Sequence, residues 1–126
     1  MSPRDIPTLI VDDEPDIRLL MRVGLELANE GLRVSGEAAS GEEALGMLES
    51  CDARVVVLDQ MMPGLTGLAT ASRIREQRPN LRLILCTAYY TGDLARQAAD
   101  VGIESCVSKD DIGHLPDEVR RVAALA

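Results

Sequence analysis

Short apolar runs rich in β-branched residues alternate along the chain with longer stretches in which apolar residues recur at helical spacing. The runs cover residues 8–11, 32–34, 55–58, 82–85 and 104–107. Each run has the length of a buried strand, and each following stretch has the periodicity of an amphipathic helix. This alternation is typical of a parallel sheet covered by helices. We therefore predict a doubly wound α/β domain of five strands and five helices, with strand order 2-1-3-4-5.

Start and stop residues place the first two helices. Pro15 suits a first turn, where its missing N–H would have no partner, and Gly31 ends that helix. Ser40 and Glu43 have the spacing of a capping box, which predicts that the second helix begins at Ser40. The residues expected to face the core are Ile17, Leu20, Met21, Gly24 and Ala28 in the first helix, and Ala44, Leu45 and Leu48 in the second.

Similar signals place the other three helices. The third is predicted to follow Thr66 and to end before Pro79. The fourth ends at Gly102, and the fifth begins near Pro116. The residues expected to face the core are Leu68, Ala71 and Ile74 in the third helix, Leu94, Ala98 and Val101 in the fourth, and Val119, Val122 and Ala123 in the fifth.

Composition and charge narrow the class of protein. A length of 126 residues fits one domain. The net charge of −8 opposes the neutralisation of phosphates on which nucleic-acid binding depends, so we expect no direct binding to nucleic acid. Cys51, Cys86 and Cys106 lack the spacing of a zinc site and are expected to act as small buried hydrophobes. With no apolar stretch long enough to span a membrane and no hydrophobic signal region, the expected location is cytoplasmic.

Polar residues follow four of the predicted strands. Asp12 and Asp13 come after the first strand, Asp59 after the third, Thr87 after the fourth and Lys109 after the fifth. Ligands of open α/β sheets bind outside the carboxyl ends of the strands, where the strand order switches. We therefore expect these side chains to converge on one pocket.

The chemistry of that pocket points to a metal ion and a phosphoryl group. Three neighbouring carboxylates repel one another unless a cation is present. An all-oxygen site favours Mg²⁺, Mn²⁺ or Ca²⁺, and Mg²⁺ is the expected ion. Lys109 and the Thr87 hydroxyl can contact phosphate oxygens, while the carboxylate of Asp59 can act as a nucleophile and form an acyl phosphate.

Each of these residues also has a purely structural explanation. Asp12 and Asp13 could belong to a capped helix start, Asp59 to a turn, and Lys109 to the solvated surface. Their common position at strand ends favours the functional interpretation, because chance would have to place all of them on the same side of the sheet.

Four motifs resemble the response-regulator receiver domains of two-component signalling, over residues 8–124. They are Leu9-Ile10-Val11-Asp12-Asp13-Glu14-Pro15, Val57-Leu58-Asp59-Gln60-Met61-Met62-Pro63-Gly64, Thr87-Ala88 and Ser108-Lys109. The resemblance implies a flavodoxin-like fold and a switch that phosphorylates and dephosphorylates itself, rather than a turnover enzyme. One receiver domain is expected over residues 1–126, with no output domain in this chain. The chain is therefore expected to be either a single-domain regulator or the receiver part of a longer protein.

The resemblance implies roles for individual residues. Asp59 would take a phosphoryl group from a sensor histidine kinase or a phosphotransfer protein. Asp13, Asp59 and the backbone carbonyl of Met61 would bind Mg²⁺ directly, and Asp12 would act through bound water. Thr87 would move inward on phosphorylation and reshape the face made by the fourth helix, fifth strand and fifth helix. This face would control an output such as transcription. It is also the expected surface for a homodimer.

Two positions depart from the family pattern. Cys106 stands where the family usually has Tyr or Phe, so we hypothesise that Tyr89 carries the coupling instead; the alternative is that Tyr89 and Tyr90 only cover the edge of the pocket. Asp110 follows Lys109 where proline is more common, which resembles receivers found ahead of helix-turn-helix domains.

Other classes of protein fit the sequence less well. A haloacid-dehalogenase-type enzyme needs Asp-x-Asp after its nucleophile strand, whereas Gln60 and Met61 follow Asp59. A flavin- or nucleotide-binding domain would show a glycine-rich loop after the first strand. A pseudo-receiver that binds proteins without phosphorylation remains the alternative, because Cys106 replaces the aromatic residue.

Overall fold

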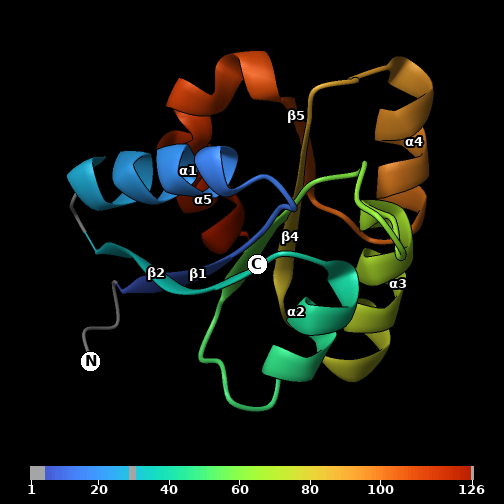
Figure 1. Ribbon diagram of the computed structural model, residues 1–126, viewed down its shortest axis with the longest axis horizontal. Coiled ribbons are helices and arrows are strands. Elements are labelled where there is room, and N and C mark those ends of the chain that lie inside the picture. The colour runs from blue at the N-terminus through green and yellow to red at the C-terminus, as the bar shows by residue number, and fades with distance from the viewer. Residues whose placement is uncertain (1–4, 29–30, 126) are drawn as a thin grey trace.

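Five parallel strands form the central layer of the protein, which we describe from a computed structural model over residues 5–28 and 31–125. The sheet order is β2-β1-β3-β4-β5, as predicted (Figure 1). Neighbouring strands are parallel throughout. The strands are β1 Ile6–Val11, β2 Leu32–Ala38, β3 Val55–Leu58, β4 Arg82–Thr87 and β5 Ser105–Ser108.

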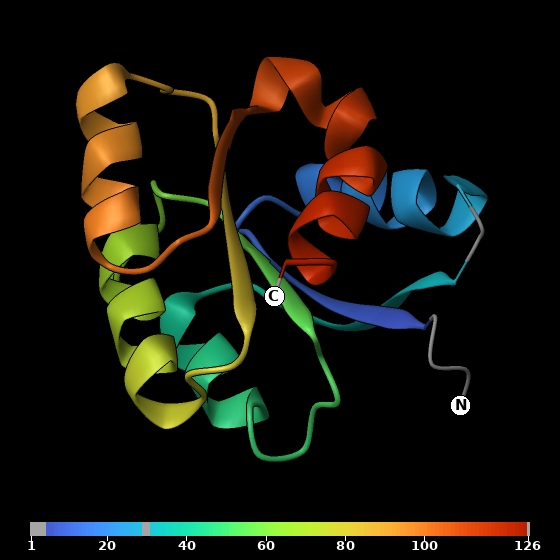
Figure 2. The same cartoon turned by 180° about the vertical axis from the view of Figure 1, so that it is seen from behind.

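Helices cover both faces of this sheet (Figures 1 and 2). α1 and α5 pack against one face, and α2, α3 and α4 pack against the other. No helix among the described residues is long and apolar enough to cross a membrane. The helices are α1 Pro15–Ala28, α2 Gly41–Met47, α3 Gly67–Gln77, α4 Gly92–Asp100 and α5 Leu115–Ala123, and the short 3-10 helix η1 covers Lys109–His114.

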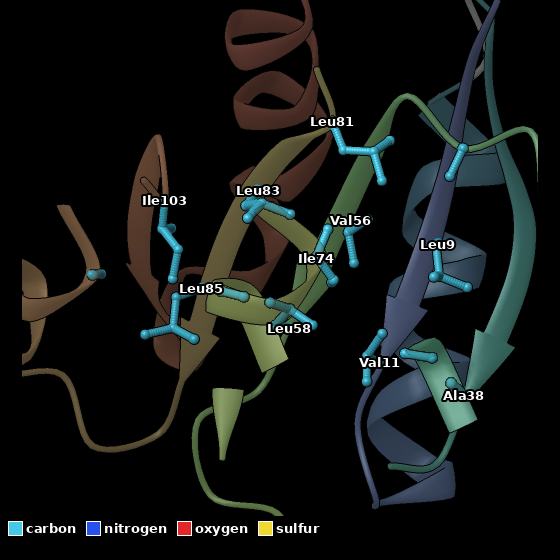
Figure 3. Close-up of a cluster of buried hydrophobic side chains, with 14 of the residues drawn as sticks. Leu9, Val11, Ala38, Val56, Leu58, Ile74, Leu81, Leu83, Leu85 and Ile103 are labelled. Carbon is cyan, nitrogen blue, oxygen red and sulfur yellow. The ribbon is translucent and has the colours of Figure 1, made fainter. Parts of the chain in front are cut away.

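The central strands are buried on both sides, which explains their continuous apolar sequences. Successive residues of a strand point to opposite faces, so Leu9 and Val11 join one core cluster while Ile10 joins the other. Figure 3 shows the first cluster, in which Leu85 of β4 lies near Leu58 of β3. All of these side chains are fully buried.

Two of the predicted helix starts are confirmed by capping hydrogen bonds. Ser40 Oγ accepts from the N–H of Glu43 at 3.0 Å, and Thr66 Oγ1 accepts from the N–H of Ala69 at 3.2 Å. Gly102 closes α4 with φ of 86°, a conformation that glycine adopts without strain. These local interactions fix where three of the helices begin or end.

The predicted inner face of α1 is partly wrong. Met21 and Leu25 are its buried residues, whereas Leu20 is 57% exposed and Gly24 is also exposed. Ile17 is half-buried and lies in the same row, four residues before Met21. Adjacent helix positions point about 100° apart, so residues 20 and 24 belong to the neighbouring row.

Strand lengths also differ from the prediction. β2 continues to Ala38 and β4 to Thr87, beyond the apolar runs. In both cases the ladder continues to the end of a neighbouring strand, since Ala38 pairs with Val11 and Thr87 pairs with Ser108. Backbone hydrogen bonding therefore extends these strands past the residues that hydrophobicity marks.

Candidate functional site

The ends of β1, β3, β4 and β5 bring four polar side chains to one edge of the sheet. Asp12 follows β1 and Asp59 follows β3, and Thr87 is the last residue of β4. The N–H of Asp59 donates to Val11 O at 2.9 Å, which holds Asp59 in line with the neighbouring strand. Asp12 and Thr87 are fully buried, and Asp59 is only 3% exposed. The site is therefore anchored in the rigid sheet.

Lys109 joins the two buried carboxylates. Its Nζ lies 2.8 Å from Asp12 Oδ2 and 3.3 Å from Asp59 Oδ2, and the side chain is 10% exposed. Burial alone lowers the pKa of Lys109, but the contacts with Asp12 and Asp59 outweigh it, so the pKa lies above its usual value. Lys109 therefore carries a full positive charge between the two acids.

The carboxyl group of Asp59 is hard to ionise in this setting. Burial is the main cause that raises its pKa, and the charge of Asp12 raises it further. Lys109 and the backbone N–H of Met61 act in the opposite direction without cancelling the shift. A further cation at this site would favour the ionised, nucleophilic form of Asp59.

An acidic cluster lies beside this ion pair. Carboxylate oxygens of Asp12, Asp13 and Glu14 all lie within 4.8 Å of one another. Asp12 Oδ2 is buried, and its charged contact among the described residues is Lys109 Nζ at 2.8 Å. Such an oxygen-only set with a buried carboxylate is compatible with Mg²⁺ binding. With Asp59, these residues would hold the ion.

Glu14 was not among the predicted metal ligands. Its Oε1 also approaches Lys109 Nζ, at 3.8 Å, and its N–H donates to Asp12 Oδ1 at 2.8 Å. The signal in the sequence was a third consecutive acid after β1, which also fits a helix start. The backbone N–H of Met61 donates a hydrogen bond to Asp59. The role of the Met61 carbonyl as a metal ligand stays a prediction.

The loop after Asp59 is pressed against the start of α3. Gln60 O accepts from the N–H of Gly67 at 3.1 Å, and Gln60 Oε1 accepts from the N–H of Leu68 at 2.9 Å. A Cβ added at Gly67 would lie 2.4 Å from Asp59 O. Gln60 and Gly67 therefore position the Asp59 backbone, a role that the sequence analysis missed.

The surroundings of Thr87 bear on the departure at Cys106. Thr87 Oγ1 accepts a hydrogen bond from the N–H of Tyr89 at 3.2 Å. The side chains of Tyr89 and Tyr90 are 70% and 48% exposed, and Cys106 is half-buried against the core. Tyr89 thus contacts Thr87 through its backbone, and a role of its side chain in coupling stays a prediction.

Comparison with known proteins identifies the family. The family model for the response regulator receiver domain matches residues 8–120. The chain belongs to the response-regulator receiver family. This receiver domain is 40% identical over 101 residues to the transcriptional activator protein ExaE of Pseudomonas putida, covering 80% of the chain and 47% of that protein.

Two further comparisons show similarity over nearly the whole chain, one in sequence and one in structure. The receiver domain is 30% identical to sporulation initiation phosphotransferase F of Bacillus subtilis, over 93% of both chains. A LuxR-family two-component response regulator from an Aurantimonas species has a structure with a TM-score of 0.90 and 26% identity, covering 95% of this chain and 86% of that one. The receiver domain is thus related to LuxR-type regulators, and it spans about half the length of ExaE.

Replacing Asp59 by asparagine is expected to stabilise the metal-free receiver domain at pH 7. Because the folded pKa of Asp59 is raised, its contribution to stability is present below the unfolded pKa and is lost as pH rises through the folded pKa. Asparagine removes that buried charge, while Asp12 still pairs with Lys109.

The expected gain in the free energy of unfolding is about 1 kcal/mol. Urea unfolding of Asp59→Asn and the unchanged chain at pH 7 and pH 4 would measure it, with the exposed Asp100→Asn as a control of equal charge change. The gain should shrink at pH 4 and with added Mg²⁺. A loss of stability at pH 7 would contradict the electrostatic account.

Proposed function

We propose that this chain is a phosphorylation switch in which Asp59 accepts a phosphoryl group from a phosphohistidine of a sensor kinase or phosphotransfer protein. The observation that carries the proposal is the contact of Lys109 Nζ with both Asp12 and the buried Asp59, beside the acidic cluster. A cation and a metal-binding acid pair around one carboxylate are what phosphoryl transfer requires.

The chemistry needs no general base. A carboxylate oxygen of Asp59 attacks phosphorus as the bond from phosphorus to the imidazole nitrogen of the donor breaks. The bonding electrons return to the imidazole, which leaves neutral when its second nitrogen carries a proton. Bound Mg²⁺ would neutralise charge on the phosphoryl oxygens. Lys109 would shift from Asp59 to one of these oxygens, and Thr87 would donate its hydroxyl to another.

The output would follow from the movement of Thr87. Turning its hydroxyl toward the phosphoryl group breaks the hydrogen bond from the Tyr89 N–H, which frees the segment between β4 and α4. We propose that this change reshapes the face of α4, β5 and α5 and so controls an output. Transcription is favoured by the similarity to the transcriptional activator ExaE and to a LuxR-family regulator. Homodimerisation through the same face belongs to this proposal.

A phosphorylation-independent, protein-binding pseudo-receiver is the second candidate. Cys106 favours it, because a half-buried thiol at this position cannot act as a rotating aromatic side chain. The two candidates differ in whether Asp59 accepts a phosphoryl group and whether that group then changes the α4, β5 and α5 face.

Beryllium fluoride, which imitates a phosphoryl group on a carboxylate, separates them. With Mg²⁺ it should shift the amide resonances of Asp59, Thr87 and residues of α4 and β5 in the unchanged chain, and should leave Asp59→Asn unaffected. Shifts confined to the strand ends would support phosphoryl binding without an output change, and the absence of any shift would favour the pseudo-receiver.

A further inference from the structure

Three arginines surround a hollow at the end of the sheet opposite to Asp59. Arg54 directly precedes β3, Arg82 begins β4, and Arg78 follows α3. The hollow has a volume of about 330 Å³, and Asn80 lines it together with the arginines. The rest of the lining comes from Ala53, Leu81, Ala123 at the end of α5 and Leu125 just after it.

The positive charge of this hollow is poorly balanced by acids. Arg54 and Arg78 form no ion pair with any acid in the described ranges. Arg82 lies 4.0 Å from Glu104, which is engaged more closely by Arg75 at 2.9 Å. Most other described arginines pair with an acid, namely Arg18, Arg22, Arg33, Arg75, Arg96, Arg120 and Arg121. In a chain of net charge −8 this local excess of cations is unusual.

Neutral carbonyl groups hold the three guanidinium groups in place. Arg54 donates to Asp5 O at 2.7 Å and more weakly to Ala123 O at 3.5 Å. Arg82 donates to Leu125 O at 2.6 Å, and Arg78 donates to Leu48 O at 2.9 Å. A guanidinium has five N–H groups, so these bonds orient each arginine and leave donors available. Carbonyl acceptors also leave its charge uncompensated.

We propose that this hollow binds a small, multiply charged phosphate compound of about the size of pyrophosphate. Planar guanidinium forks match the paired oxygens of a phosphate, and several together bind more than one negative charge. The volume suits a small ligand, and the overall negative charge of the chain disfavours an extended polyanion such as nucleic acid. The bound anion would join the starts of β3 and β4 to the last turn of α5.

Titration of the metal-free chain with pyrophosphate at constant ionic strength, followed by amide and arginine side-chain NMR, tests the proposal. Omitting metal keeps the anion away from the acidic pocket at Asp59. We expect saturable shifts confined to residues 53–54 and 78–82 and the end of α5, with half-saturation at about 1 mM. Inorganic phosphate should bind more weakly, and a short single-stranded oligonucleotide should not bind.

Substitutions make the assignment specific. Arg78→Gln should weaken binding at least tenfold, and Arg54→Lys, which keeps the charge but loses the fork, should weaken it less. Arg73→Gln removes an exposed arginine of α3 and should leave binding unchanged. Shifts that grow linearly without saturation, binding that survives Arg78→Gln, or preference for the oligonucleotide would each overturn the proposal and leave these arginines as caps for the end of α5.

Discussion

Replacement of Lys109 by alanine is expected to remove roughly 3 kcal/mol from the free energy of unfolding at pH 7 without metal. The ammonium group lies 2.8 Å from the fully buried Asp12 and 3.3 Å from Asp59. Its loss leaves two buried carboxylates without a counter-charge, which costs more than the ion pair contributes. We expect Mg²⁺ to restore part of the lost stability.

Urea unfolding with and without Mg²⁺ would measure this effect, and Lys109→Ala in the Asp59→Asn background should show a smaller loss. Magnesium binding itself should remain largely intact in Lys109→Ala, whereas the response to phosphorylation should be lost. Lys109 is the only lysine in the sequence, so its side-chain resonance can be followed by NMR to test whether its pKa is raised. A full phosphorylation-dependent response in Lys109→Ala would refute its role.

The second large effect is expected for Gly67→Ala, at the first residue of α3. An added Cβ would lie 2.4 Å from Asp59 O and 2.7 Å from Leu85 Cδ1, so the Asp59 loop has to move. We expect a loss of roughly 2 kcal/mol in the free energy of unfolding. Phosphoryl transfer to Asp59 should also slow, because the nucleophile is displaced.

Gly92→Ala provides the matched control. Gly92 is likewise the first residue of a helix that follows a threonine cap, and a Cβ there would meet nothing within 4 Å. This substitution should be neutral or should stabilise the chain by about 0.5 kcal/mol. If both variants show the same free energy of unfolding and the same rate of phosphorylation, the close approach of Gly67 to Asp59 O does not affect stability or phosphoryl transfer.

Much of this fold and site was predictable because hydrophobic period and strand ends are local properties. The apolar run at 55–58 gave both ends of β3 correctly. The polar residues after the strands could be placed at one edge of the sheet because the carboxyl ends of parallel strands lie together. These residues are Asp12, Asp59, Thr87 and Lys109. The structure brings Asp12, Asp59 and Lys109 into contact, as the pattern implied.

What the sequence could not provide depends on contacts between distant segments. Leu20 is exposed because α1 faces the sheet with the neighbouring row of residues, which includes Met21 and Leu25. Apolar residues occur in both rows of this helix, so the sequence alone does not say which row is buried. The part played by Gln60 depends on how its loop folds onto α3, and that of Glu14 on the position of Lys109. The excess of positive charge around Arg54 appears only when the starts of β3 and β4 are brought together.

The most direct test of the central claim is intact-protein mass spectrometry after incubation with acetyl phosphate and Mg²⁺. The unchanged chain should gain the mass of one phosphoryl group, whereas Asp59→Asn, or the unchanged chain with a chelator, should gain none. An increment that persists in Asp59→Asn, or its absence from a folded, metal-binding chain, would contradict the account that Asp59 is the phosphoryl acceptor.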